Sequence, residues 1–152
     1  MPDLKKAELI QGTVYLMASP VSLNHGDSDS LVQGWLLNYA AATEGVKSST
    51  NTTTRLGPKD VPQPDGILRI LPEFGGNSTV EQREKVLYLK GGPELAFEVA
   101  LSSKSIDANA KKESYLQAGV QEYVLWQIES GRIDWWRLCL LYTSPSPRDS
   151  DQ

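Results

Sequence analysis

Two kinds of apolar periodicity alternate along this chain, and that mixture is what most constrains its fold. Residues 27–42 carry apolar side chains at the spacing of an amphipathic helix, and a second helix is predicted over residues 106–118, where Gly119 ends it. Shorter segments bounded by glycine, proline or polar clusters are typical of strands. These predicted strands cover residues 8–17 as a strand or hairpin around Gly12, then 46–56, 63–71, 86–90 and 94–101, and finally a hairpin of 122–128 with 132–138. Helices and strands interspersed in this way predict an α/β fold with a central mixed sheet flanked by helices.

The chain length predicts one domain. A chain of 152 residues is long enough for one substantial core and too short for two. We place the domain in residues 1–138 and interpret residues 139–152, which lack periodicity, as a disordered or non-native tail. Residues 72–85 are polar and contain two glycines, so we expect a long flexible loop there. Residues 27–30 supply candidates for the N-cap of the first helix.

Composition excludes several classes of protein. No run reaches the roughly 18 apolar residues of a membrane span and no signal peptide is recognisable, so we expect a cytoplasmic protein without a membrane partner. The single cysteine, Cys139, excludes an internal disulfide and a multi-cysteine metal site. The formal net charge of −4 argues against a basic nucleic-acid-binding surface. A site that gathers carboxylates around a divalent cation nevertheless contributes negative charge of its own.

Two carboxylates in predicted strands are candidate metal ligands. Glu98 interrupts the apolar run 94–101, where an ionised side chain is costly unless it is paired, hydrogen-bonded or bound to a metal. Asp65 lies in the strand predicted over residues 63–71. Two carboxylates on neighbouring strands can serve as ligands of Mg²⁺, and water and phosphate oxygens then complete its coordination. The residues alone leave the alternatives open, because a one-sided strand also shows a glutamate to water and Pro-Asp-Gly is a common turn.

The predicted second helix places Asp107, Lys111 and Tyr115 on one face, at positions i, i+4 and i+8. A lysine near a metal site positions the attacking water or stabilises the charge of the transition state. The alternative is an exposed ion pair worth about 0.3–0.5 kcal/mol beside a core tyrosine. Spacing alone favours the exposed ion pair.

An ordered set of motifs runs from about Glu8 to Leu138. It comprises IQGTVYLMASP (residues 10–20), His25, QPD (63–65), PELAFEV (93–99), DxxxKxxxY (107–115) and AGVQEY (118–123). The set resembles the Uma family of restriction endonucleases, within the PD-(D/E)XK nuclease superfamily. The resemblance implies a restriction-endonuclease-like fold and Mg²⁺-dependent hydrolysis of DNA, with Mn²⁺ as a substitute metal.

The resemblance also implies roles for individual residues. Asp65 and Glu98 are expected to be catalytic and to bind the metal, and Glu8 to add a further acidic group, although a solvated strand residue is an equal alternative. His25 is expected as a general base or phosphate contact, against the alternative of a surface loop residue. The accessory residues implied in this way are Glu8, His25, Asp107 and Tyr115.

The chain departs from the superfamily pattern at one position. Two residues after the acidic residue, where the pattern has a lysine, this chain has Ala100. The resemblance implies that Lys111, on the next helix, stands in for the missing lysine as a catalytic residue. Lys104 and Lys112 remain alternatives.

Adjacent tryptophans mark the predicted terminal hairpin. Trp135 and Trp136 face opposite sides of its sheet because side chains alternate along a strand. One is expected in the core. The other covers a helix, or stacks on a base in a contact worth about 1–3 kcal/mol.

Three functions stay open on the sequence alone. The first is a metal-dependent endonuclease that hydrolyses DNA phosphodiester bonds, with a homodimer as one expected assembly, because nucleases that cut both strands often pair two sites. The second is a non-catalytic nucleic-acid-binding or assembly module on a nuclease-like fold, which the acidic net charge permits. The third is a glycoside hydrolase that uses Asp65 and Glu98 without a metal.

Overall fold

A computed structural model describes residues 4–18, 22–101 and 108–140 of the chain. Among the helices in these ranges, none has the length and apolar character needed to cross a membrane. The elements follow in the order β1 (Leu4–Ile10), β2 (Thr13–Ala18), α1 (Leu23–Ala41), β3 (Val46–Thr50), β4 (Thr54–Arg55), β5 (Gly66–Ile70), the 3-10 turn η1 (Pro72–Phe74), β6 (Thr79–Arg83), β7 (Val86–Lys90), β8 (Leu95–Ala100), α2 (Ala108–Gln117), β9 (Glu122–Gln127) and β10 (Arg132–Arg137).

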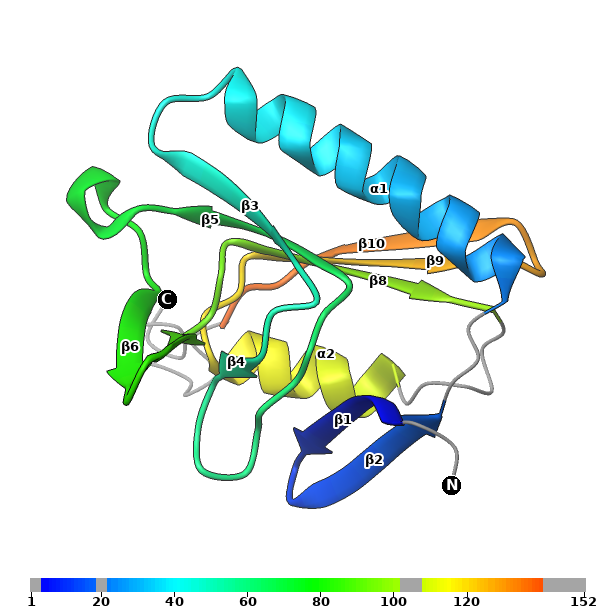
Figure 1. The fold of residues 1–152 in the computed structure, drawn as a ribbon, viewed down its shortest axis with the longest axis horizontal. Coiled ribbons are helices and arrows are strands. Elements are labelled where there is room, and N and C mark those ends of the chain that lie inside the picture. Colours follow the sequence, from blue (N-terminus) through cyan, green and yellow to red (C-terminus); the bar gives the residue numbers. More distant parts are fainter. Residues whose placement is uncertain (1–3, 19–21, 102–107, 141–152) are drawn as a thin grey trace, which may run out of the picture.

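The centre of the fold is a mixed five-stranded sheet with strand order β10-β9-β8-β5-β3. The pair β8–β9 is parallel, because α2 connects the two strands, and the other pairs are antiparallel. Figure 1 shows α1 across one face of this sheet and α2 across the other, with the β1–β2 hairpin beside α2. The predicted α/β fold with a central mixed sheet flanked by helices is confirmed.

Strand β8 separates two apolar clusters, and all six of its residues are buried. Its odd-numbered side chains, with Phe97 at their centre, pack against Val32 and Leu36 of α1. Its even-numbered side chains face α2, where Ala96 and Ala100 meet Tyr115. A strand covered on both faces has no polar side. Any charged residue on β8 must therefore find its partners inside the protein.

Helix α1 begins earlier than the sequence predicted. Its N-cap is Ser22, which has an extended backbone and whose hydroxyl accepts a hydrogen bond of 3.2 Å from the backbone N–H of His25. The prediction of a cap within residues 27–30 is wrong, because these residues continue the helix and Ser28 is buried. A serine caps a helix where its backbone is extended, and that condition is met only at the earlier position.

The expected loop over residues 72–85 is also wrong. Pro72–Phe74 forms a 3-10 turn, and Thr79–Arg83 pairs in register with Val86–Lys90 as an antiparallel hairpin. Most side chains of β6 are exposed, so this strand of the hairpin carries little apolar periodicity. Cross-strand backbone hydrogen bonds, which leave no pattern in the sequence, hold it together.

The strand predicted over residues 46–56 divides into two. Asn51 has a positive φ of 50°, which breaks the extended backbone, so β3 joins the central sheet while β4 pairs with β7. The β1–β2 hairpin, β5, β7, β8, α2 and the β9–β10 hairpin agree with the predicted elements to within a few residues at their ends.

The backbone at Gly92, just before β8, packs closely against the backbone that follows α2. A Cβ atom added there would lie 2.7 Å from the carbonyl oxygen of Ala118 and 3.0 Å from the backbone nitrogen of Val120. We expect Gly92→Ala to lower the free energy of unfolding by about 1–3 kcal/mol, measured by urea unfolding. The control is Gly34→Ala in α1, where a Cβ meets nothing within 4 Å. It should leave stability unchanged or raise it by up to about 1 kcal/mol; equal effects of the two substitutions would contradict the packing argument.

Candidate active site

Glu98 is buried in the central strand, with only 2% of its surface exposed. Alternation along β8 directs it to the face that α2 covers, between the positions of Ala96 and Ala100. The alternative interpretation, a glutamate shown to water by a one-sided strand, is wrong because the second helix closes that face. The carboxylate therefore depends on hydrogen bonds and opposite charges within the protein.

Asp65 lies immediately before β5 and is held on three sides. Its Oδ2 accepts a hydrogen bond of 2.7 Å from the backbone N–H of Val99, the residue after Glu98. Its carbonyl oxygen accepts hydrogen bonds from Gln33 Nε2 of α1 at 2.6 Å and from the backbone N–H of Asn51 at 3.1 Å. These bonds, rather than a solvent-exposed turn, bring the Asp65 carboxylate beside Glu98.

Lys111 and Tyr115 project from one face of α2 toward Glu98. Lys111 Nζ lies 3.0 Å from Glu98 Oε1, and the Tyr115 hydroxyl donates to the same oxygen at 3.2 Å. Both side chains are buried, with 3% and 1% of their surfaces exposed. The expectation of an exposed ion pair on this face is wrong for Lys111. Its expected partner, Asp107, lies outside the described residues.

Glu8 brings the N-terminal hairpin to the same point. It is 3% exposed, its Oε1 accepts a hydrogen bond of 2.7 Å from the backbone N–H of Gln63, and its Oε2 lies 2.9 Å from Lys111 Nζ. The alternative of a solvated strand residue is wrong. The ammonium group of Lys111, on α2, thus contacts carboxylates from both β1 and β8.

Lys6 is the site residue that the sequence interpretation missed. Its Nζ lies 3.8 Å from Glu8 Oε1, 3.6 Å from Asp65 Oδ1 and 3.8 Å from Glu98 Oε2. The one available signal was its spacing, since residues two apart on a strand share a face and Glu8 was already a candidate. Nothing in the sequence shows that three carboxylates converge on this lysine.

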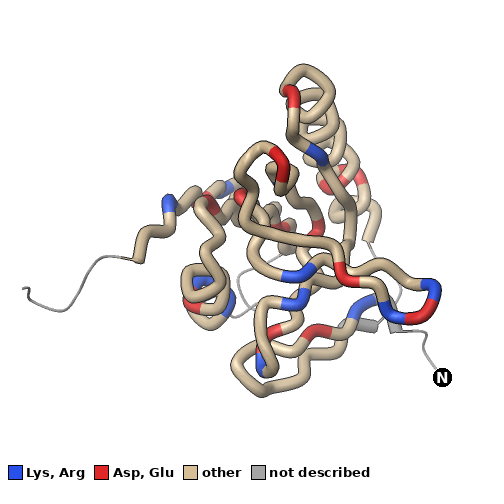
Figure 2. Tube along the Cα trace, turned by 90° about the vertical axis from the view of Figure 1, so that its left-hand side faces the viewer, with Lys and Arg blue, Asp and Glu red and all other residues tan. Residues whose placement is uncertain are grey.

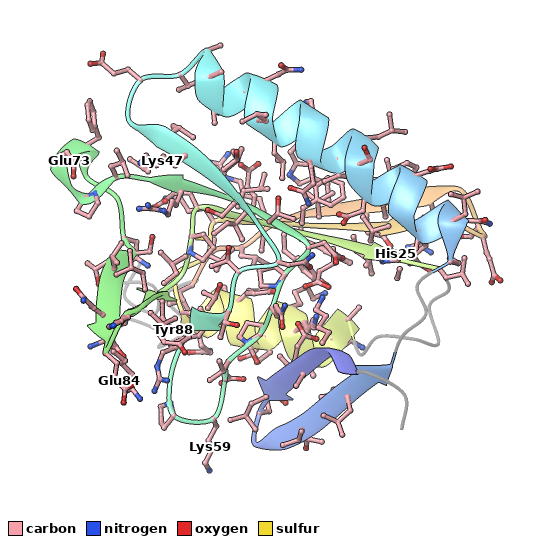
Figure 3. All side chains as sticks on the ribbon, in the orientation of Figure 1. His25, Lys47, Lys59, Glu73, Glu84 and Tyr88 are labelled. Atoms are coloured by element: carbon pink, nitrogen blue, oxygen red, sulfur yellow. The ribbon has the colours of Figure 1, made fainter. Side chains whose placement is uncertain are left out.

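Two other lysines and the histidine occupy different positions. Lys112 Nζ lies over the Trp136 ring, 4.9 Å from its centroid, while Lys104 lies outside the described residues. His25 lies in the first turn of α1, near the end of β8 (Figure 3), and its Nε2–H donates to the carbonyl oxygen of Val99 at 2.8 Å. The structure therefore brings Glu8, Asp65, Glu98, Lys111 and Tyr115 together and ties His25 to the adjoining backbone.

The terminal tryptophans face opposite sides, as predicted. Trp136 stacks on Tyr123, with ring centroids 5.3 Å apart. Trp135 is half exposed and meets Trp35 of α1 edge-on, with ring centroids 5.9 Å apart. The helix-covering alternative for the outer tryptophan is confirmed.

The described residues of the cluster balance most of their charge among themselves. Within the described ranges, no three Asp, Glu, His or Cys side chains lie close enough together to hold a metal ion. Two ammonium groups, from Lys6 and Lys111, accompany the three carboxylates instead. If all five groups are ionised, the cluster carries one net negative charge.

Comparisons with known proteins give the family and the fold of the chain. The family model described as "Uma2: Putative restriction endonuclease" matches residues 1–146. The chain belongs to this family. A search of curated proteins found no match. Among solved structures, a "putative nuclease belonging to DUF820" from Anabaena variabilis ATCC 29413 superposes with a TM-score of 0.66 at 14% identity, over 87% of this chain and 72% of that one. The fold is thus restriction-endonuclease-like, as the resemblance implied.

Burial and mutual repulsion set the protonation of the carboxylates. Burial, together with the charge of Glu98, raises the pKa of Asp65 from 3.8 to about 6, against the opposing effects of Lys6 and the Val99 N–H. Burial also acts to raise the pKa of Glu98, but Lys111 and Lys6 outweigh it and hold that pKa below its ordinary value. Burial acts to lower the pKa of Lys6, and the three carboxylates outweigh it in turn.

The raised pKa of Asp65 has a measurable consequence for stability. A carboxyl whose pKa is higher in the folded state than in the unfolded state destabilises the fold as pH rises through the window from about 4 to about 6. We expect Asp65→Asn to be more stable than the unsubstituted chain at pH 8, and this difference to shrink at pH 4.5, in urea unfolding with a chelator present. The exposed Asp27→Asn serves as control and should show the same small difference at both pH values. An Asp65→Asn variant that is less stable at pH 8 would contradict the prediction.

The two buried tyrosines provide a matched pair of variants. The Tyr115 hydroxyl donates to Glu98, whereas the Tyr123 hydroxyl has no hydrogen-bond partner among the described residues. Tyr115→Phe should cost about 1–3 kcal/mol because it removes a donor from a buried carboxylate, while Tyr123→Phe should be neutral or stabilising. Urea unfolding of both variants at pH 7 makes the comparison. Equal losses would show that the tyrosine hydroxyl does not stabilise Glu98.

Proposed function

We propose that this chain is a divalent-metal-dependent endonuclease of the PD-(D/E)XK type that hydrolyses the phosphodiester bonds of DNA. The observation that carries the proposal is the burial of Glu8, Asp65 and Glu98 around the ammonium groups of Lys6 and Lys111. Burying charges costs free energy. A fold with a buried ion pair is rarely more stable than one with apolar side chains of similar volume in its place. Clusters of this kind are characteristic of active sites, where function rather than stability requires them.

The proposed metal ligands are Asp65 and Glu98, with Mg²⁺ as the metal and Mn²⁺ as its substitute. Carboxylate oxygens are the ligands that Mg²⁺ prefers, and one or two of them suffice when water and phosphate complete the coordination. The contacts to Lys6 Nζ support a preference for a cation at this point. When bound, the metal would activate the attacking water and stabilise the charge that develops on the phosphoryl oxygens.

Lys111 is the proposed replacement for the lysine missing at Ala100. Ala100 is 5% exposed and packs in the apolar cluster beneath α2. Lys111 approaches Glu98 from the helix instead and holds its ammonium group at the same carboxylate. In the proposed reaction it orients the attacking water or stabilises the transition state, while Tyr115 fixes Glu98 by a hydrogen bond.

A nucleic-acid substrate is consistent with the family, and DNA is our proposal. In the view of Figure 2, the positions of basic and acidic residues are interspersed along the chain trace. Binding would then rely less on counterion release than in a strongly basic protein. The metal would neutralise part of the charge where the scissile phosphate meets the carboxylates.

One observation favours the alternative of a non-catalytic nucleic-acid-binding or assembly module. Each carboxylate of the cluster already has a lysine partner, and the charges nearly balance without a metal. Such a module binds DNA without cleaving it and without needing Mg²⁺.

Cleavage of supercoiled plasmid in the presence of Mg²⁺ decides between these functions. Asp65→Ala and Glu98→Gln should each lower the nicking rate by at least about 1000-fold, because each removes a proposed metal ligand. Circular dichroism checks that both variants fold. Glu73→Gln, on the exposed turn η1 (Figure 3), is the matched control and should nick at the unsubstituted rate.

Three outcomes would contradict the endonuclease. An unchanged nicking rate in Asp65→Ala excludes its role as a metal ligand. Retarded DNA migration without cleavage favours the binding module. Cleavage of a sugar substrate that survives a chelator favours the two-carboxylate glycosidase. The cytoplasmic location and the homodimer stay predictions.

A further inference from the structure

Lys6 contacts the three carboxylates in a different way from Lys111. Lys111 makes short contacts of 2.9 Å and 3.0 Å, within the range of charged hydrogen bonds. Lys6 Nζ instead lies between 3.6 Å and 3.8 Å from one oxygen of each carboxylate. It makes no single short bond to any of them. The ammonium group of Lys6 is therefore held by the combined attraction of three carboxylates and not by one hydrogen bond.

The oxygens around Lys6 include those that the proposed metal requires. Asp65 Oδ2 is engaged by the Val99 N–H, and Glu98 Oε1 is engaged by Lys111 and Tyr115. The remaining oxygens, Asp65 Oδ1 and Glu98 Oε2, are the two that face Lys6. A Mg²⁺ ion binds carboxylate oxygens at about 2.1 Å. An ammonium group and a divalent ion cannot both lie against the same two oxygens, because like charges at such short range repel strongly.

The charge balance favours exchange over addition. With Lys6 in place, three carboxylates and two ammonium groups leave one net negative charge. Adding a divalent cation beside Lys6 would leave one net positive charge in a buried site. Replacing Lys6 by the divalent cation leaves the site neutral. A neutral buried cluster carries the smaller desolvation penalty.

The attachment of β1 allows Lys6 to leave. The hairpin is joined to the rest of the protein beyond Lys6, through backbone hydrogen bonds between Leu9 and Val61 and through the Gln63 N–H bond to Glu8. The pairing of β1 with β2 is irregular between Leu4 and Lys6. A lysine side chain also has a flexible four-carbon stem. Its ammonium group can therefore withdraw without breaking the contacts that hold Glu8 in the site.

We infer that Lys6 is the resident cation of the site and that a divalent metal ion binds only by displacing it. The inference rests on the proposed function, since it assigns the metal to Asp65 and Glu98. Lys6 is then a residue that sets metal affinity: it keeps the three carboxylates folded together before the metal arrives, and it weakens metal binding by competing for the same oxygens.

Calorimetric titration of the full chain with Mn²⁺ tests the inference without measuring activity. Lys6→Met should bind Mn²⁺ at least about 10-fold more tightly than the unsubstituted chain, because the competing charge is gone. Without metal, its Tm should be lower by about 10 °C, since buried carboxylates lose a partner. Mn²⁺ should restore most of that loss. Lys6→Arg keeps the charge, and Lys59→Met removes a lysine that projects from the loop before β5 (Figure 3); both should bind as the unsubstituted chain does.

The outcomes separate this inference from the proposed function. Equal or weaker Mn²⁺ binding by Lys6→Met, with binding by the unsubstituted chain that is lost in Asp65→Ala, overturns the displacement of Lys6 and leaves the metal site standing. Absence of Mn²⁺ binding in both the unsubstituted chain and Lys6→Met overturns both proposals. Tighter binding by Lys6→Met alone supports the inference.

Lysine footprinting of the unsubstituted chain gives a second test that does not depend on how Lys6→Met folds. Lys6 is 10% exposed in its side chain, so acetylation of its amine should be slow without metal. Mn²⁺ should increase the acetylation of Lys6 several-fold, read by peptide mass spectrometry, while the exposed Lys59 serves as the constant reference. Unchanged protection of Lys6 at saturating Mn²⁺ would overturn the inference.

Discussion

The contact between Glu98 and Lys111 is the interaction on which the rest of the structure depends. A carboxylate enclosed in the central strand of a sheet is tolerated only with a nearby positive charge and hydrogen bonds. Lys111 and Tyr115 supply them from one face of α2, so the helix packs on the sheet in the one register that places both over Glu98. The same ammonium group holds Glu8 and thereby attaches the N-terminal hairpin. The Lys111 ammonium group thus holds together β8, α2 and the distant strand β1.

The cluster is arranged at the expense of stability, as expected of a functional site. Asp65 has a pKa raised to about 6, so its ionised form, the form a metal ion requires, is the one that the fold disfavours. Lys6 reduces that unfavourable repulsion without forming a short bond to any carboxylate. An apolar cluster of the same size would pack more favourably. Membership of a nuclease family provides a reason for keeping the charges.

Long-range contacts explain three points that the sequence left open or missed: the strand at residues 79–83, the burial of Glu98 and the place of Lys6. Residues 79–83 lack an apolar face and were expected in a loop, but they form a strand because β7 supplies backbone hydrogen bonds. Glu98 was left open as a water-exposed residue because alternation on one strand does not reveal a helix on its second face. Lys6 was not a candidate, because two of the three carboxylates that surround its ammonium group, Asp65 and Glu98, come from elements distant in the sequence.

The sequence alone predicted the α/β class, most of the elements and the family, together with four charged candidates: Glu8, Asp65, Glu98 and Lys111. Local periodicity and ordered motifs carry that information, because they depend on residues close together along the chain. The packing of the folded chain showed that these four side chains converge, that Tyr115 joins them and that Lys6 lies among the carboxylates. Lys111 and Glu8 are 103 residues apart, and the charges meet because helix and hairpin pack on the same face of the sheet. The spacing of Glu8 and Lys111 along the chain does not predict this contact. It forms because α2 and the N-terminal hairpin both pack around the same buried charges.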